Sequence, residues 1–200
     1  MKYIIEHMEE EFSDWVKLEY AQIARDIGGS NLILTSVSEE TQKLVPAQFT
    51  QLGIHITNVN VTEFGQLDSQ FAKEKVILLD PAASQELTPE DFQAYDYFLF
   101  GGILGDHPPR DRTGELRKLG FVGRHLGKTQ MTTDTAVRVV DLVSKGQKLS
   151  EIEYIDFPEL KFSKHESTEM PFRYVNGGDG KPILPEVSLG SRRIMALFVY

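Results

Sequence analysis

The chain has 200 residues, a length that fits one domain with its own hydrophobic core. It contains no cysteine, which excludes disulfide bonds and thiolate metal sites, and its formal net charge of -9 disfavours broad contact with nucleic-acid phosphates. No apolar run approaches the roughly 20 residues that span a bilayer. The start of the chain turns acidic too early for a signal peptide, and the histidines lack metal-ligand spacing. We therefore expect a cytoplasmic protein without a metal ion.

The first part of the chain predicts a strand, a helix and a second strand. Residues 2–8 have the apolar centre of a strand. Ser13 is a candidate N-cap for an amphipathic helix that stops at Gly28 and Gly29. Residues 31–36 predict the second strand. Because a helix separates the two strands, we expect them to pair in parallel.

Shorter elements follow. Pro46 is suited to the start of a helix over residues 47–52. Apolar and polar residues alternate over 54–61, which is typical of an edge strand. Residues 64–75 are polar and only weakly periodic, and we predict a loop with a helical turn there.

Two apolar runs, at 76–79 and 97–100, predict buried strands that end in residues suited to a ligand site. The first ends at Asp80, directly before a proline. The second runs into Gly101 and Gly102, which let the backbone come close to a ligand; a tight turn would also explain them. Ligands of open α/β sheets sit just beyond such strand ends.

The helices around these strands have recognisable starts. Thr88 is a candidate cap for a short helix before residue 97, and Thr113 for another that runs to 119. Residues 121–125 predict a brief strand. The polar turn at 130–135 precedes a helix that ends near Gly146, and its hydroxyl and amide groups could meet a ligand at a helix N-terminus.

Four segments carry a resemblance to a known family: YIIEHMEEEFSDW, FGGILGDHPPRDRT, KTQMTTDTA and TEMPFRYV. They resemble the SPOUT-class methyltransferases, most closely the branch that methylates an arginine of ribosomal protein number three of the small subunit. The resemblance extends to about residue 186, and the last segment, SLGSRRIMALFVY, departs from it. It implies an α/β fold with an open, mainly parallel sheet, flanking helices and a C-terminal trefoil knot. We expect one domain over 1–200, with 151–200 as an extension that shapes the substrate site, and a monomer.

The resemblance also implies S-adenosylmethionine as the cofactor and S-adenosylhomocysteine as the product, with the cofactor bent inside the knot between three loops. Apolar side chains in these loops can sandwich adenine while backbone groups read its edge. The expected cofactor-binding residues are Leu79, Asp80 and Pro81 in the first loop, Gly101, Gly102, Ile103, Leu104 and Gly105 in the second, and Gln130, Met131, Thr132, Thr133 and Ala136 in the third.

Methylation of arginine requires carboxylates near the target. A guanidinium is almost always charged, so an enzyme must orient it and accept the proton that is lost as the N–C bond forms. Asp106 and Asp134 are the main catalytic candidates, and Glu6 and Glu169 are weaker ones. Structural roles are the alternatives: Asp134 suits the first turn of a helix, Asp106 a turn cap, and Glu6 a solvent-facing position.

The charge distribution leaves the substrate class open. Residues 151–170 hold six acidic residues and two lysines, which favours docking of a basic protein, here a ribosomal protein. Residues 101–128 hold six basic and three acidic residues, which would suit RNA. The alternatives to a protein-arginine methyltransferase are therefore a SPOUT-class RNA methyltransferase and a non-catalytic module that binds a cofactor or partner. We expect no membrane association.

Overall fold

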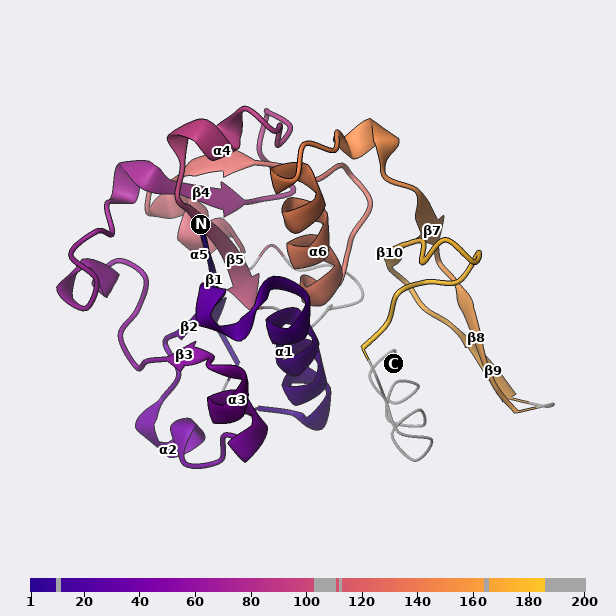
Figure 1. Ribbon diagram of the computed structural model, residues 1–200, viewed down its shortest axis with the longest axis horizontal. Coiled ribbons are helices and arrows are strands. Elements are labelled where there is room, and N and C mark those ends of the chain that lie inside the picture. Colours follow the sequence, from indigo (N-terminus) through magenta and orange to yellow (C-terminus); the bar gives the residue numbers. More distant parts are fainter. Residues whose placement is uncertain (10–11, 103–110, 112, 164–165, 186–200) are drawn as a thin grey trace.

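The computed structural model describes residues 1–9, 12–102, 111, 113–163 and 166–185. Its centre is a sheet of six parallel strands in the order β3-β2-β1-β5-β4-β6 (Figure 1). The strands are β1 (Lys2–His7), β2 (Leu32–Thr35), β3 (His55–Ile56), β4 (Val76–Leu79), β5 (Tyr97–Gly102) and β6 (Val122–Arg124). The expected open, parallel α/β sheet is confirmed.

Helices cover both faces of this sheet. The α-helices are α1 (Asp14–Ile27), α2 (Glu39–Gln42), α3 (Ala47–Leu52), α4 (Asp91–Ala94), α5 (Thr113–Lys118) and α6 (Thr133–Ser144). Short 3-10 helices are η1 (Gly29–Asn31), η2 (Phe64–Gln66), η3 (Lys73–Lys75) and η4 (Leu149–Glu151). Helices α1, α3 and α6 share a core with Ile5 and Phe98 on one face, whereas α5 packs with Ile4 and Leu99 on the other.

Most predicted boundaries are confirmed, with two exceptions among the short elements. Ser13 caps α1, since its Oγ accepts a hydrogen bond from the amide of Val16 at 3.2 Å. The strand expected over 54–61 is only the two-residue edge strand β3. Helix α4 begins at Asp91, later than a cap at Thr88 predicts. The carboxylate of Asp91 nevertheless accepts a hydrogen bond from the amide of Thr88 at 3.0 Å, as in a capping box.

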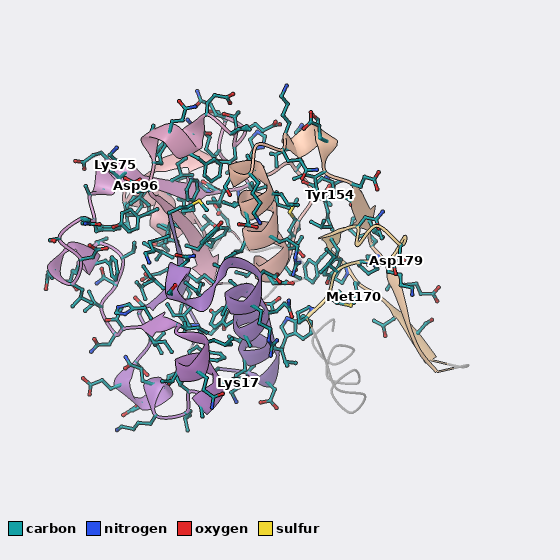
Figure 2. The ribbon with its side chains drawn as sticks, in the orientation of Figure 1. Lys17, Lys75, Asp96, Tyr154, Met170 and Asp179 are labelled. Atoms are coloured by element: carbon teal, nitrogen blue, oxygen red, sulfur yellow. The ribbon has the colours of Figure 1, made fainter. Side chains whose placement is uncertain are left out.

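The C-terminal part contains strands that the sequence patterns did not predict. They are β7 (Tyr154–Asp156), β8 (Glu159–Ser163), β9 (Glu166–Glu169) and β10 (Arg173–Val175). The antiparallel β8–β9 hairpin projects away from the main sheet (Figure 1), and β10 pairs with β7. Met170, between β9 and β10, packs against Trp15 of α1 where this part meets the sheet domain (Figure 2).

No helix within the described residues combines the length and hydropathy that a bilayer crossing requires.

Candidate active site

A pocket of about 480 Å³ lies at the carboxyl ends of β4 and β5, the edge at which parallel sheets bind ligands. Its walls come from these strand ends, from α5, and from the segment between β6 and α6. Its lining residues are Leu79, Asp80, Pro81, Ala82, Phe100, Gly101, Asp111, Thr113, Arg117, Leu126, Gly127, Lys128, Thr129, Gln130, Met131, Thr133 and Ala136. Apolar side chains and exposed polar groups are thus combined in a space large enough for a nucleoside.

Most of the predicted cofactor residues come together in this pocket. Leu79, Asp80 and Pro81 line it from the first predicted loop, Gly101 from the second, and Gln130, Met131, Thr133 and Ala136 from the third. Ile103, Leu104 and Gly105 lie outside the described residues. Three segments that are far apart in the sequence therefore form one site because their strands end at one edge of the sheet.

Two predicted cofactor residues, Gly102 and Thr132, are not among the lining residues. A Cβ atom on Gly102 would lie 2.7 Å from the backbone oxygen of Glu6, so the glycine allows the close approach of β5 to β1. Thr132 is buried at the N-cap of α6, and its hydroxyl hydrogen-bonds that of Thr135 at 2.9 Å. The structure thus gives both residues a role in packing.

Arg117 joins two acidic residues across one wall of the pocket. Its Nε and Nη2 donate to Asp80 at 2.5 and 2.8 Å, and its Nη1 and Nη2 donate to Asp111 at 2.9 and 3.0 Å. Burial alone would raise the pKa of Asp80, but the bonds from Arg117 and from the amide of Ala82 bring it below its usual value. The Arg117 bonds also lower the pKa of Asp111 and raise that of Arg117. All three groups are therefore charged at neutral pH.

Sequence reasoning missed this bridge and the segment from Leu126 to Thr129. Residues 121–125 were predicted as a strand, and β6 is indeed present there. Because β6 is parallel to β4, the residues that follow it reach the same edge as Asp80. The sequence analysis predicted the strand but not its pairing with β4. The pairing of Arg117 with Asp80 was not predicted either, since 37 residues separate them.

Of the four predicted catalytic carboxylates, the three that the structure describes do not gather at one point. Asp106 lies outside the described residues. Asp134 is fully buried in the first turn of α6, beside the pocket residue Thr133. Glu169 is exposed on β9, directly opposite Glu159 of β8. Glu6, Asp134 and Glu169 therefore form no common cluster in the described part of the chain.

Glu6 is buried rather than exposed to solvent. Its carboxylate accepts hydrogen bonds from the hydroxyl of Thr35 at 2.5 Å, from the hydroxyl of Ser36, and from the amide of Val61 at 3.1 Å. Glu6 follows Ile4 on the face of the sheet that packs with α5, whereas the pocket residue Phe100 belongs to the other face. These bonds tie β1 to β2 and to the segment after β3, which accounts for Glu6 as a structural residue.

Comparison with known proteins places the chain in a family. A family model described as protein arginine N-methyltransferase SFM1-like matches residues 2–190. The chain belongs to this SFM1-like family. The protein arginine N-methyltransferase SFM1 of Saccharomyces cerevisiae is 52% identical over 194 residues, which covers 93% of this chain and 91% of the yeast protein. The chain is thus homologous to an enzyme along nearly its whole length.

Solved structures of SFM1-like and more distant proteins extend the comparison. The crystal structure of yeast SFM1 complexed with S-adenosylmethionine matches with a TM-score of 0.87 and 47% identity, covering 99% of this chain and 89% of that one. The same yeast protein has been solved with S-adenosylhomocysteine. A dual-specific Trm10 protein from Thermococcus kodakaraensis matches with a TM-score of 0.56 at 20% identity, covering 75% of this chain and 95% of that one. The latter likeness concerns the fold, which is of the SPOUT class.

Proposed function

We propose that this chain is an S-adenosylmethionine-dependent protein-arginine N-methyltransferase whose substrate is ribosomal protein number three of the small subunit. The observation that carries the proposal is the match, over nearly the full chain, to a methyltransferase solved with S-adenosylmethionine. The pocket supports it, since three separate segments predicted to hold this cofactor line one space at the strand ends. We propose in addition a C-terminal trefoil knot, a monomeric state, a cytoplasmic location and release of S-adenosylhomocysteine.

The residues of the pocket suit the parts of this cofactor. Leu79, Phe100, Leu126 and Met131 offer apolar surface for the flat adenine ring. Gly101 and Gln130 also line the pocket, where residues of this kind can bind the polar edges of the ligand. The cofactor would supply a methyl group on a sulfonium, which is transferred in line to a nucleophile. The protein's contribution is to hold the target nitrogen about 3 to 3.5 Å from that carbon.

The chemistry also requires a carboxylate beside the target nitrogen. As the new N–C bond forms, the C–S bond breaks with its electron pair on sulfur, and the nitrogen loses one proton. We propose Asp134 and Asp106 as the residues that orient the guanidinium and receive this proton. Asp134 is supported by its place beside the pocket.

The C-terminal extension is the proposed docking region for the basic substrate. The described residues Glu151, Glu153, Asp156, Glu159 and Glu169 are exposed along this part of the chain. Their charge complements a basic protein segment and would speed its association. In this proposal Glu169 acts in docking, from the β8–β9 hairpin that projects away from the main sheet (Figure 1).

Transfer of a labelled methyl group from S-adenosylmethionine to purified small ribosomal subunits tests the proposal. After the reaction, ribosomal proteins and RNA are separated and counted, and the labelled protein is hydrolysed to identify methylarginine. Label in one basic protein, lost in the Asp134→Asn variant, is the expected result. Label in RNA would replace the proposal by an RNA methyltransferase, and cofactor binding without transfer to either fraction would favour a non-catalytic binding module.

A further inference from the structure

Arg138 of α6 is shared between two acidic residues. Its Nη2 donates a hydrogen bond to Asp26 of α1 at 2.5 Å, and its Nη1 lies 3.6 Å from a carboxylate oxygen of Asp134, one turn earlier on α6. This Nη1 makes no hydrogen bond within the described residues. The side chain of Asp26 is 23% exposed and that of Asp134 is 0% exposed. One guanidinium thus connects an acidic residue near the surface with a fully buried one.

Asp134 depends on this guanidinium for its charge. Burial raises the pKa of Asp134, and the positive charge of Arg138 is the strongest effect that opposes the rise. Hydrogen bonding by Thr132 and Thr135 also lowers this pKa, whereas the charge of Asp26 raises it. A buried carboxyl group without a compensating charge takes up a proton. Arg138 therefore favours the ionised form of Asp134.

Two more ionisable groups face Asp134 from the elements packed against α6. They are Glu19 of α1 and Tyr174 of β10. Burial, followed by the charge of Asp134, raises the pKa of each of them. Both are therefore protonated at neutral pH, and the negative charge of this group of three side chains lies on Asp134. Arg138 supplies the opposite charge.

The bond to Asp26 keeps Arg138 from pairing fully with Asp134. A free guanidinium binds a carboxylate through two parallel hydrogen bonds of about 2.8 Å. Here the short contact goes to Asp26, and both carboxylate oxygens of Asp134 lack a hydrogen-bond donor of good geometry among the described residues. Direct hydrogen bonds from Arg138 would lower the pKa of Asp134 further and make it a weaker base.

We propose that Asp26 and Arg138 are positioning residues for Asp134. Arg138 keeps the buried carboxylate ionised, and Asp26 holds Arg138 back, so that an oxygen of Asp134 can receive the proton that the target nitrogen loses as its bond to the methyl carbon forms. Asp26 and Arg138 do not line the cofactor pocket. The role of Asp134 as proton acceptor rests on the proposed function, whereas the control of its charge can be tested without methyl transfer.

The first test is a pH titration of the full chain with ¹³C-labelled aspartate carboxyl groups, followed by NMR. The Asp134 signal is identified by its loss in Asp134→Asn. We expect the titration midpoint of this signal to fall by about one pH unit in Asp26→Asn and to rise by about one in Arg138→Gln. Because both variants lose the same ion pair, a purely structural role predicts no such opposite shifts. Arg138→Lys keeps the cation and should reduce the rise.

A second ion pair on α6 provides the matched controls. Lys145 pairs with Asp141 at 2.6 Å, further along the helix from Asp134. Asp141→Asn and Lys145→Gln remove the same kinds of charge and should leave the Asp134 midpoint unchanged. Shifts in the controls as large as those at Asp26 and Arg138 would assign the effect to net charge and refute the proposal.

The second test measures methyl transfer to small ribosomal subunits as a function of pH. Transfer should fail at low pH as Asp134 takes up a proton, so this limb should move to lower pH in Asp26→Asn and to higher pH in Arg138→Gln. We expect kcat of Arg138→Gln to recover at high pH. In Asp26→Asn it should stay several-fold low at every pH, because Arg138 then bonds directly to Asp134. The Kd for S-adenosylhomocysteine should not change in either variant.

The outcomes separate this proposal from the proposed function. Midpoints that stay unchanged or move in the same direction refute the role of Asp26 and Arg138, as do pH limbs that do not follow the midpoints. Opposite shifts in a chain that transfers no methyl group refute the proposed function and leave the control of the Asp134 charge standing. Asp26 is partly exposed, so Asp26→Asn decides by itself if Arg138→Gln loses its fold. A midpoint that does not fall in this variant overturns the proposal.

Discussion

The amide nitrogen of Arg173 donates a hydrogen bond to the backbone oxygen of Gln130 at 2.8 Å. This bond, together with the bridge between Met131 and Arg173, joins β10 to a segment that lines the pocket. The strand is in turn attached to β7. The C-terminal extension therefore supports the wall of the pocket directly, through hydrogen bonds of the backbone.

Removal of this amide donor should weaken cofactor binding. The Arg173→Pro variant has no N–H at this position. Proline is tolerated in a strand where the missing N–H makes no hydrogen bond to the neighbouring strand. Here it serves Gln130 rather than β7. We expect the Kd for S-adenosylmethionine to rise several-fold by calorimetry, which corresponds to about 1 kcal/mol for one lost hydrogen bond.

Arg173→Ala is the matched control for the proline variant. It keeps the amide but removes the paired bonds to Asp156 at 2.6 and 2.8 Å and the contact of the guanidinium with the Tyr154 ring. It should bind the cofactor nearly as the unmodified chain does. Equal losses in the two variants would show that the side chain, not the backbone bond, stabilises the wall.

Arg117→Gln should lower cofactor affinity more strongly. Asp80 is 2% exposed at its side chain, and among the described residues Arg117 is the cation that pairs with it. Because Arg117 itself is 39% exposed, solvent screens part of the loss. We expect the Kd for S-adenosylhomocysteine to rise about tenfold, or about 1.4 kcal/mol.

The neighbouring variant Lys118→Gln controls for the loss of one positive charge on α5. Lys118 is exposed, and its ammonium pairs on the surface with Glu115 at 2.6 Å. The Kd of the Lys118→Gln variant for S-adenosylhomocysteine should match that of the unmodified chain. Equal effects at residues 117 and 118 would mean that net charge, rather than the bridge, determines affinity.

Gly102→Ala should destabilise the fold. The added Cβ would lie 2.7 Å from the backbone oxygen of Glu6 and 3.0 Å from Ile5 Cγ2, so β1 and β5 would have to separate. We expect the free energy of unfolding by urea to fall by about 2 kcal/mol. In Gly65→Ala the nearest atom is 3.7 Å away, so a similar loss there would refute the steric explanation.

His7 should make the protein sensitive to acid. Its ring is buried against Phe12, and burial lowers its pKa to about 4. The unfolded chain binds a proton below about pH 6.5, whereas the folded chain resists protonation until about pH 4. The contribution of His7 is therefore fully present above pH 6.5 and is lost as the pH falls between these values, by up to about 3 kcal/mol.

Urea unfolding at several pH values measures this loss. In His7→Phe, the fall in stability between pH 6.5 and 4 should be smaller, although the variant lacks the bond between Nδ1 and the Tyr20 hydroxyl at 3.1 Å. The exposed His55 provides the control, because His55→Gln should keep the original pH dependence. An unchanged slope in His7→Phe would assign the acid sensitivity to other groups.

The sequence by itself determined the sheet, since each strand carries a local signal. The runs at 76–79 and 97–100 are apolar on both faces, as is typical of buried parallel strands. Ser13 and Gly53 lie at helix ends, where only a few residue types fit. The loops after β4 and β5 were therefore expected at the carboxyl edge of the sheet. The resemblance of their motifs to a known family implied S-adenosylmethionine as the cofactor.

Only the tertiary structure decided which polar groups meet. Glu6 was expected to face a site or solvent, but its carboxylate accepts hydrogen bonds from the hydroxyls of Thr35 and Ser36. Gly102 lies so close to β1 that an added Cβ would meet the backbone oxygen of Glu6. The bridge of Arg117 to Asp80, and the contact of Glu19 with Asp134 across α1 and α6, join residues far apart in the chain. Such pairs produce no recognisable pattern in the sequence. Their strength depends on burial and on the distance between the charges, and both are determined by the packing of the folded chain.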